Sequence, residues 1–265
     1  MSADARQVCW LNACFKVPAD WEIIAYSIEE RMGRLEFGTR LGFQGLFSWE
    51  PSNRAPDIKA LFASFPVRPG KTRKEDQYQT AEVGRFILGW GSAEEPCLAI
   101  AFLANAKKLL RWVFPTSGRE MRAEEIKPIL ASVEPNEGDL RRCCAFGLDF
   151  RIPAEYRIEH AKIRPADVEL LFESPNRARA FFHRWGLPDA LLQGRSLEAY
   201  YTDFLRSAGA HVRLVRRVEL LGMEALEALY SQTGEHHMDR FMGRQWTNGI
   251  GRLWHDRIAK RLYAC

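Results

Sequence analysis

The chain has 265 residues, of which 46% are hydrophobic and 27% are charged, with a formal net charge of +4. These values are typical of a soluble globular protein with room for two ordinary domains or one large one. No apolar run approaches the roughly 18 residues that a membrane helix needs, so a membrane-spanning protein is excluded.

The start of the sequence and the cysteines favour the cytoplasm. MSADARQVCW has no basic start followed by an apolar stretch, so no secretory signal is expected. Cys143 and Cys144 are neighbours and no C-x-x-C spacing exists, which argues against a disulfide framework and a zinc framework. We expect reduced, mostly buried thiols. The six cysteines are Cys9, Cys14, Cys97, Cys143, Cys144 and Cys265.

The charge is unevenly spread along the chain. Residues 1–140 hold 18 Lys+Arg against 19 Asp+Glu, whereas residues 141–265 hold 20 against 15, which sums to 38 and 34. All six histidines also fall in the second part. Such asymmetry can mark a part that meets an anionic partner, although a solvated surface explains it equally simply.

An internal repeat is the strongest signal. FKVPADWEI at 15–23 has a near-echo in FRIPAEYRI at 150–158, which is 135 residues further on. Phe15 and Val17 alternate as on a strand with one buried face, and the following proline ends that strand because it has no N–H for the ladder. Self-similarity of this kind indicates a duplicated unit.

The next elements also occur in pairs. The sequence predicts strands at 33–37 and 168–172, and then at 46–49 and 182–185, where the last two end in Trp49 and Trp185. Apolar residues at helical spacing predict helices over 55–65 and 196–206, with Asp57 and Ser196 as caps.

Strand patterns then return in both copies. Gly84 and Gly222 lie at the centre of corresponding segments, and two strands follow, joined by a turn at 105–108 in the first copy and near Lys260 in the second. The first copy continues with a helix at 123–135, for which the second copy has no counterpart before Cys265, so we expect the sequence to end on a strand. Whether the natural chain extends further is not predicted.

The order of elements gives the expected domains and fold. Residues 1–140 form the first repeat, and residues 141–265 form the second, which lacks the C-terminal helix. The pattern F-x-V-P-x-x-W, followed by G-R-L-x-F, a strand ending in Trp, a helix and a strand with a central glycine, resembles the PsbP/Mog-like family. This resemblance implies an α+β fold in which each repeat is an antiparallel sheet with helices packed on its faces. Members of that family are binding proteins, among them photosystem subunits and partners of Ran GTPase, and no catalytic residue carries over.

Several motifs were weighed as sites of chemistry. RPGKT at 68–72 lacks the glycine five residues before Gly70 that a phosphate loop requires. His236 and His237 could bind a metal with His255, but adjacent histidines point in different directions, which favours solvated loop residues. No known nucleophile signature surrounds any cysteine.

A nucleic-acid interface is the other alternative. Arg216 and Arg217 belong to a basic run, and Trp254 lies among arginines, as in proteins that stack bases and contact phosphates. Core anchoring explains the tryptophans equally well.

We therefore expect a cytoplasmic, non-catalytic binding or assembly protein that has no cofactor and no metal, and whose partner is another protein. The alternatives are an enzyme with a histidine-containing cleft between the repeats, and nucleic-acid binding by the basic second half. The oligomeric state and the ligand are not predicted. The candidate binding residues are Trp49, Trp185, Arg216, Arg217, His236, His237, Trp254 and His255.

Overall fold

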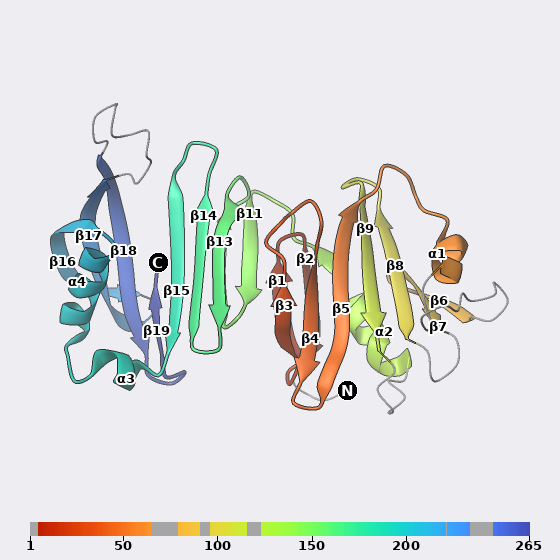
Figure 1. The fold of residues 1–265 in the computed structure, drawn as a ribbon, viewed down its shortest axis with the longest axis horizontal. Coiled ribbons are helices and arrows are strands. Elements are labelled where there is room, and N and C mark those ends of the chain that lie inside the picture. The colour runs from red at the N-terminus through yellow and green to blue at the C-terminus, as the bar shows by residue number, and fades with distance from the viewer. Residues whose placement is uncertain (1–4, 65–78, 91–95, 116–122, 221, 234–245) are drawn as a thin grey trace. The chain divides into compact units, whose positions relative to one another are not determined.

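The chain is mostly β-structure, built from three antiparallel sheets with a few short helices (Figure 1). The computed structural model describes residues 5–64, 79–90, 96–115, 123–220, 222–233 and 246–265. Contacts group the chain into two compact units, Met1–Ala154 and Glu155–Cys265. The first unit holds two of the sheets and the second unit holds the third. Within the described part of the chain, no helix has the length and apolar character needed to cross a membrane.

The first seven-stranded sheet has the order β3-β4-β5-β9-β8-β7-β6. Its strands are β3 (Glu22–Tyr26), β4 (Gly33–Thr39), β5 (Gly42–Pro51), β6 (Gln79–Val83), β7 (Phe86–Trp90), β8 (Cys97–Leu103) and β9 (Lys108–Phe114). Helix α1 (Ile58–Ser64) packs on one face, where the fully buried Phe62 contacts Leu98, Ile100 and Leu109. The predicted cap is confirmed, because the Asp57 carboxylate accepts a hydrogen bond from the Ala60 backbone N–H at 3.1 Å.

A five-stranded sheet, in the order β10-β2-β1-β11-β12, covers the other face. Its strands are β1 (Ala5–Trp10), β2 (Ala13–Pro18), β10 (Glu134–Pro135), β11 (Leu140–Ala145) and β12 (Leu148–Pro153). Phe15 on β2 packs edge-on against Phe47 and Trp112, with ring centroids 5.0 and 5.1 Å apart. The alternation of Phe15 and Val17 therefore has its cause in this packing of sheet on sheet. Helix α2 (Ala123–Ala131) contacts β2 and β6 and closes the layer.

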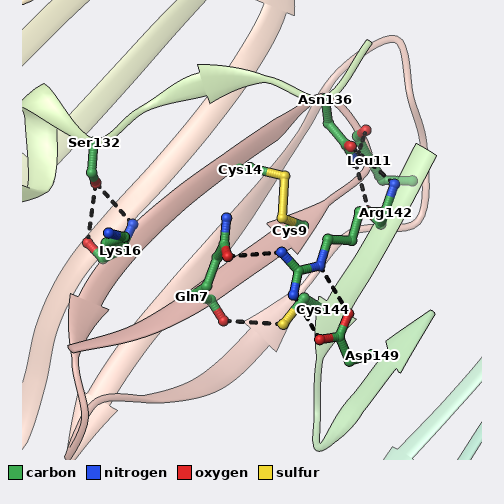
Figure 2. The surroundings of a disulfide bond; sticks show 10 residues. All are labelled: Gln7, Cys9, Leu11, Cys14, Lys16, Ser132, Asn136, Arg142, Cys144 and Asp149. Atoms are coloured by element: carbon green, nitrogen blue, oxygen red, sulfur yellow. Dashed lines mark hydrogen bonds and ion pairs between the residues drawn. A yellow bond between two sulfur atoms is a disulfide. The ribbon is translucent and has the colours of Figure 1, made fainter. Parts of the chain in front are cut away.

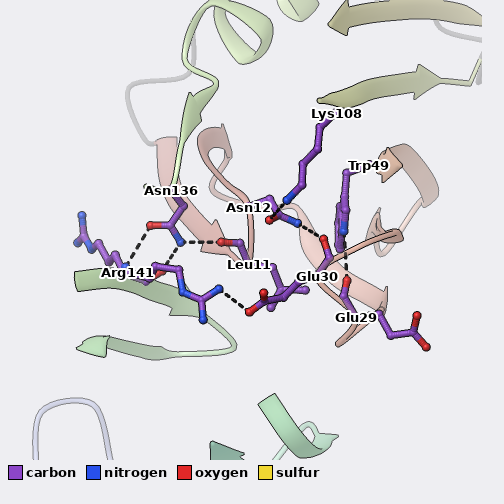
Figure 3. Close-up of polar contacts among 9 residues, drawn as sticks. Leu11, Asn12, Glu29, Glu30, Trp49, Lys108, Asn136 and Arg141 are labelled. Carbon is purple, nitrogen blue, oxygen red and sulfur yellow. Dashed lines mark hydrogen bonds and ion pairs between the residues drawn. The ribbon is translucent and has the colours of Figure 1, made fainter. Parts of the chain in front are cut away.

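Buried polar contacts fix the turns of this sheet (Figure 3). The Asn136 amide donates to the backbone oxygens of Leu11 and Arg142, at 3.2 and 2.8 Å, and its oxygen accepts from the Arg142 N–H. The Arg141 guanidinium binds the Glu30 carboxylate at 2.5 Å. Because Asn136 is only 9% exposed, these contacts satisfy polar groups that would otherwise be buried without partners.

The second seven-stranded sheet has the order β13-β14-β15-β19-β18-β17-β16. Its strands are β13 (Arg157–Arg164), β14 (Asp167–Glu173), β15 (Arg179–Gly186), β16 (Ala210–Leu220), β17 (Met223–Thr233), β18 (Trp246–Asp256) and β19 (Arg261–Ala264). Helix α3 (Pro188–Leu192) precedes helix α4 (Leu197–Ser207), whose Tyr201 and Leu205 are buried against this sheet. Ser196 caps α4 as predicted, and the expected final strand is confirmed as β19.

The two seven-stranded sheets have the same strand order when β3–β9 are compared with β13–β19. The hairpins that precede them are also equivalent, since β2 and β12 carry the repeated sequence. Strand β1 pairs antiparallel with β11 so that Cys9 lies opposite Cys144, its equivalent 135 residues on. Two equivalent strands that meet at equivalent residues are related by a local two-fold axis. The repeat boundary at 140/141 stays a prediction, because contacts group β11 and β12 with the first unit.

The α+β expectation with helices on the sheet faces is wrong. The structure describes four short helices, the longest of 11 residues, and one sheet is covered mainly by another sheet. The helical rhythm was located correctly, but the strands between helices are longer than their patterns indicated. Strands β16, β17 and β18 each have 11 residues. Gly84 and Gly222 lie in the hairpin turns between strands, where their φ of +58° and +74° suits glycine.

The matching of Trp49 with Trp185 is also wrong, by one residue. Leu35 lies opposite Phe47, and Leu170 lies opposite Phe182, so Phe47 corresponds to Phe182. Trp49 then corresponds to Arg184, and Trp185 lies on the other face, against α4. A shift of one residue along a strand moves every side chain to the opposite face, which the local sequence could not reveal.

Two of the expected free thiols form a disulfide (Figure 2). Cys9 and Cys14 are directly opposite each other on β1 and β2, with Cα atoms 4.0 Å apart. The expectation of reduced thiols throughout is therefore wrong for this pair. Six cysteines without a motif gave no pairing, whereas the hairpin register brings these two together.

Glycine at position 33 allows Trp49 to pack, and its substitution tests this contact. A Cβ at Gly33 would lie 2.6 Å from the Trp49 ring. We expect Gly33→Ala to lower the free energy of unfolding by about 1–3 kcal/mol because the ring must shift, measured by urea denaturation. Gly45→Ala on β5 is the control, because its added Cβ meets no atom closer than 3.4 Å. An equal effect of the two substitutions would contradict this role of Gly33.

Candidate functional site

A row of charged residues crosses three strands of the second seven-stranded sheet. Arg216 on β16, Glu227 on β17 and Arg252 on β18 lie directly opposite one another. The Arg216 guanidinium donates to Glu227 Oε1 at 2.9 and 2.5 Å, and the Arg252 guanidinium donates to Oε2 at 3.0 and 2.9 Å. Each carboxylate oxygen therefore accepts a two-pronged contact from one arginine. These hydrogen bonds hold the pKa of Glu227 below its ordinary value.

The same row in the first seven-stranded sheet is apolar. Phe47 pairs with Trp112, and that row continues through Ala99 and Leu88 to Ala81. Trp112, Ala99 and Leu88 are fully buried there, on the face that β1, β2 and α2 cover. In the second sheet Cys265 exchanges backbone hydrogen bonds with Arg252, so it occupies the place of Trp112.

Apolar side chains border the charged row on both sides. Trp254 on β18 stacks on Tyr263 of β19, with ring centroids 5.3 Å apart. On the other side, Leu214 and Ile250 are 45% and 65% exposed, and both lie opposite Leu229. We define the arginine face by six residues: Leu214, Arg216, Glu227, Ile250, Arg252 and Trp254. Arginine and aromatic residues beside exposed aliphatic ones are typical of a protein-binding surface.

The candidate residues from the sequence are only partly brought together. Arg216 and Trp254 lie on the arginine face. Arg217 and His255 point to the opposite face, because each is one residue further along its strand. Arg217 pairs there with Glu224 at 3.3 Å.

The remaining candidates are buried or lie outside the described residues. Trp49 is 2% exposed and donates its indole N–H to the Glu29 oxygen at 3.2 Å (Figure 3). Trp185 is 6% exposed and packs in the core beneath α4. Both tryptophans anchor cores. His236 and His237 lie outside the described residues, as does RPGKT.

A buried polar cluster that the sequence did not reveal lies at β13–β15. His183 Nε2 lies 2.6 Å from Asp167, whose other oxygen binds Lys162 at 2.5 Å. The His183 ring stacks on Trp185 at 3.7 Å, and burial lowers its pKa. Because the ring is 5% exposed and covered by aromatic side chains, a substrate has no access to it. The cluster is therefore part of the core.

The thiols are not poised for nucleophilic attack. Burial raises the pKa of Cys143, Cys144 and Cys265, so each is a protonated thiol at neutral pH. Over the described ranges, no group of three or more His, Cys, Asp or Glu residues has a metal-binding arrangement.

A shallow hollow of about 440 Å³ lies at the β3–β4 hairpin in the first unit. Both charge signs line it, from Asp20, Glu22 and Arg40, together with the apolar Ile24 and Leu41. It holds none of the groups that activate a nucleophile, so its chemistry is that of an ordinary surface.

Comparison with known proteins gives no family. No protein-family model matches the chain, and no curated protein sequence matches it. A similar solved structure is the apo structure of the immunity protein TplEi of the T6SS from Pseudomonas aeruginosa. That chain is 13% identical, the match covers 98% of this chain and 86% of that chain, and the TM-score is 0.34. A TM-score of this size does not establish a common fold, so no function is carried over from that protein.

The resemblance to the PsbP/Mog-like family is wrong. The residues that suggested it, such as Phe15, Val17 and Pro18, serve a hairpin that pairs with a second hairpin in a mostly β structure. Such core and turn residues recur in unrelated β-proteins, because they satisfy strand alternation and strand termination alone.

Glu227 gave one signal that could have been recognised in the sequence. It lies in the apolar run MEALEALY at 223–230, at a position that strand alternation places beside Ala225 and Leu229. A carboxylate in such a strand needs partners on neighbouring strands. The sequence does not say which arginines provide them.

The charged row predicts a pH-dependent stability. In Glu227→Gln the two guanidiniums lose their neutralising carboxylate, so the free energy of unfolding at neutral pH should fall. Because the folded pKa of Glu227 is lowered, its stabilising effect is present above the ordinary value of 4.5 and is lost as the pH falls through the folded value. The difference between the wild type and the variant should therefore shrink in acid, as measured by urea denaturation.

Glu224→Gln is the matched control, because the Glu224 side chain is 66% exposed and its pair with Arg217 is at the surface. A Glu227→Gln variant as stable as the wild type at neutral pH would refute the role of the row. So would a loss of stability that is unchanged in acid.

Proposed function

We propose that this protein is a non-catalytic binding protein that recognises an acidic surface of another protein through the arginine face. The observation that carries the proposal is the exchange of a buried apolar row in the first sheet for a charged row with exposed aliphatic neighbours in the second. A face that served only the core would not need Leu214 and Ile250 at 45% and 65% exposure.

Charge complementarity supports an acidic partner. The row holds two arginines against one glutamate, and β16 also presents the exposed Arg213 and Arg217. Residues 141–265 have an excess of 20 − 15 = 5 basic residues. Such an excess steers an acidic protein toward the surface and makes the association sensitive to salt.

The same geometry disfavours nucleic acid as the ligand. The Glu227 carboxylate already accepts hydrogen bonds from both arginines, so a phosphate would have to compete with it. Trp254 is half-buried and its ring stacks on Tyr263, which leaves it poorly placed to stack a base. Leu214 and Ile250 offer aliphatic contact, which suits a protein better than a phosphate backbone.

The side chains also support a non-catalytic role. His183 is enclosed by aromatic rings, and the thiols of Cys143, Cys144 and Cys265 are protonated at neutral pH. His255 lies on the face opposite to Arg216 and Arg252, so it does not join the charged row.

A cytoplasmic location is part of the proposal. The reduced thiols of Cys143, Cys144 and Cys265 suit a reducing compartment, whereas the disulfide Cys9–Cys14 is more typical of an oxidising one. Cys9 is fully buried, which protects that bond from soluble reductants. Fractionation of the native cell, with immunodetection of the protein, tests this location.

Affinity capture with matched variants tests the function. Three baits are compared in the native cell: the wild type, Leu214→Ser/Ile250→Ser, and the control Leu41→Ser/Ile24→Ser in the first unit, where the two side chains are 91% and 57% exposed. We expect an acidic protein that the wild type and the control retain and that the arginine-face variant loses. After purification of that protein, the arginine-face variant should bind it at least about tenfold more weakly than the wild type.

The proposal fails if the arginine-face variant captures the same proteins as the wild type. It also fails if nuclease treatment removes the captured material, because the ligand is then a nucleic acid.

A further inference from the structure

Three cysteines form one row across the five-stranded sheet (Figure 2). Cys14 on β2 lies opposite Cys9 on β1, and Cys9 lies opposite Cys144 on β11. Residues that lie directly opposite in adjacent strands project from the same face of the sheet. Cys9 therefore has a cysteine neighbour on each side, of which only Cys14 is bonded to it.

The distances of strand pairing allow either neighbour to bond Cys9. Opposed residues in an antiparallel pair have Cα atoms roughly 4.5–5.5 Å apart, which lies within the range of about 4.4–6.8 Å that disulfides span. The Cys144 thiol already lies against β1, because it donates a hydrogen bond to the Gln7 backbone oxygen at 3.4 Å. Gln7 is two residues before Cys9 on the same strand.

We propose that Cys9, Cys14 and Cys144 form a thiol–disulfide exchange site. The Cys144 thiolate attacks the sulfur of Cys9, a Cys9–Cys144 bond forms, and the Cys9–Cys14 bond breaks. Cys14 leaves as a thiolate and takes up the proton that Cys144 lost. The step conserves electrons and needs no added oxidant. Because Cys14 and Cys144 lie on opposite sides of Cys9, the attacking sulfur approaches opposite to the leaving sulfur.

The groups around the row set the conditions for exchange. Asp149 lies opposite Cys144 on β12, and Arg142 binds that carboxylate at 2.9 and 2.7 Å and the Gln7 side-chain oxygen at 2.8 Å. Burial and the Asp149 charge raise the pKa of Cys144, while Arg142 and Arg6 oppose that effect. Exchange should therefore be faster at alkaline pH, where more of the thiol is ionised. Cys143 projects to the other face and is buried, so it takes no part.

The two disulfide forms would link different parts of the chain. The observed bond closes a hairpin, with a sequence separation of 5. The alternative bond would join β1 to β11, with a separation of 144 − 9 = 135, and would link the two repeated hairpins covalently.

A variant lacking Cys14 tests whether Cys144 can bond Cys9. Full-length Cys14→Ser protein is oxidised with oxidised glutathione, alkylated, digested without reduction and mapped by mass spectrometry. We expect a Cys9–Cys144 cross-linked peptide and the loss of Cys144 alkylation. Cys14→Ser/Cys144→Ser is the control, in which Cys9 should remain open to alkylation or carry glutathione. Separate alkylation or glutathionylation of Cys9 and Cys144 in the folded Cys14→Ser variant would overturn the proposal.

The wild-type protein gives a second test that does not depend on the folding of a variant. It is held at neutral and at alkaline pH without a redox reagent, quenched in acid and alkylated. Exchange appears as alkylated Cys14 together with a Cys9–Cys144 peptide, in larger amount at alkaline pH. If Cys144 is alkylated and Cys14 stays bonded to Cys9 at both pH values, the exchange does not occur.

Discussion

The pairing of β1 with β11 is the contact on which the first unit depends. These strands belong to two hairpins of nearly the same sequence, and they meet with Cys9 opposite Cys144. The backbone hydrogen bonds between them join the hairpins into one five-stranded sheet. Phe15 can then lie over Phe37, Phe47 and Trp112, so the aromatic core of the first seven-stranded sheet has a cover. Without this pairing, β1 would have an open edge.

The two seven-stranded sheets show how one strand order can carry different side-chain chemistry. The row from Trp112 to Ala81 is apolar where β1, β2 and α2 cover it. At the equivalent row of the second sheet, Glu227 is held between Arg216 and Arg252. A carboxylate is tolerated there because two guanidiniums satisfy its oxygens, whereas in the first sheet the same group would be buried among aromatic rings. The backbone register is shared, and the surroundings decide which side chains fit.

The cysteines follow the same geometric rule as the charged row. Each strand of a sheet gives a residue two opposite neighbours, so a residue in an inner strand has a choice of partners. Glu227 uses both of its neighbours at once, because a carboxylate has two oxygens. Cys9 can use only one at a time, because its sulfur forms a single disulfide. Equivalent positions in a sheet therefore lead to a fixed ion-pair row in one place and to alternative bonding in the other.

The sequence by itself determined the elements whose signals are local. The 135-residue repeat, the helices near 55–65 and 196–206, and the caps Asp57 and Ser196 all depend on residues close together along the chain. Only the tertiary structure decided that Trp49 corresponds to Arg184, that Cys9 bonds Cys14, and that Glu227 lies between two arginines. These facts depend on the register between strands, where a shift of one residue exchanges the two faces. Register is set by packing and backbone pairing across the whole sheet, so it is not encoded in any single strand.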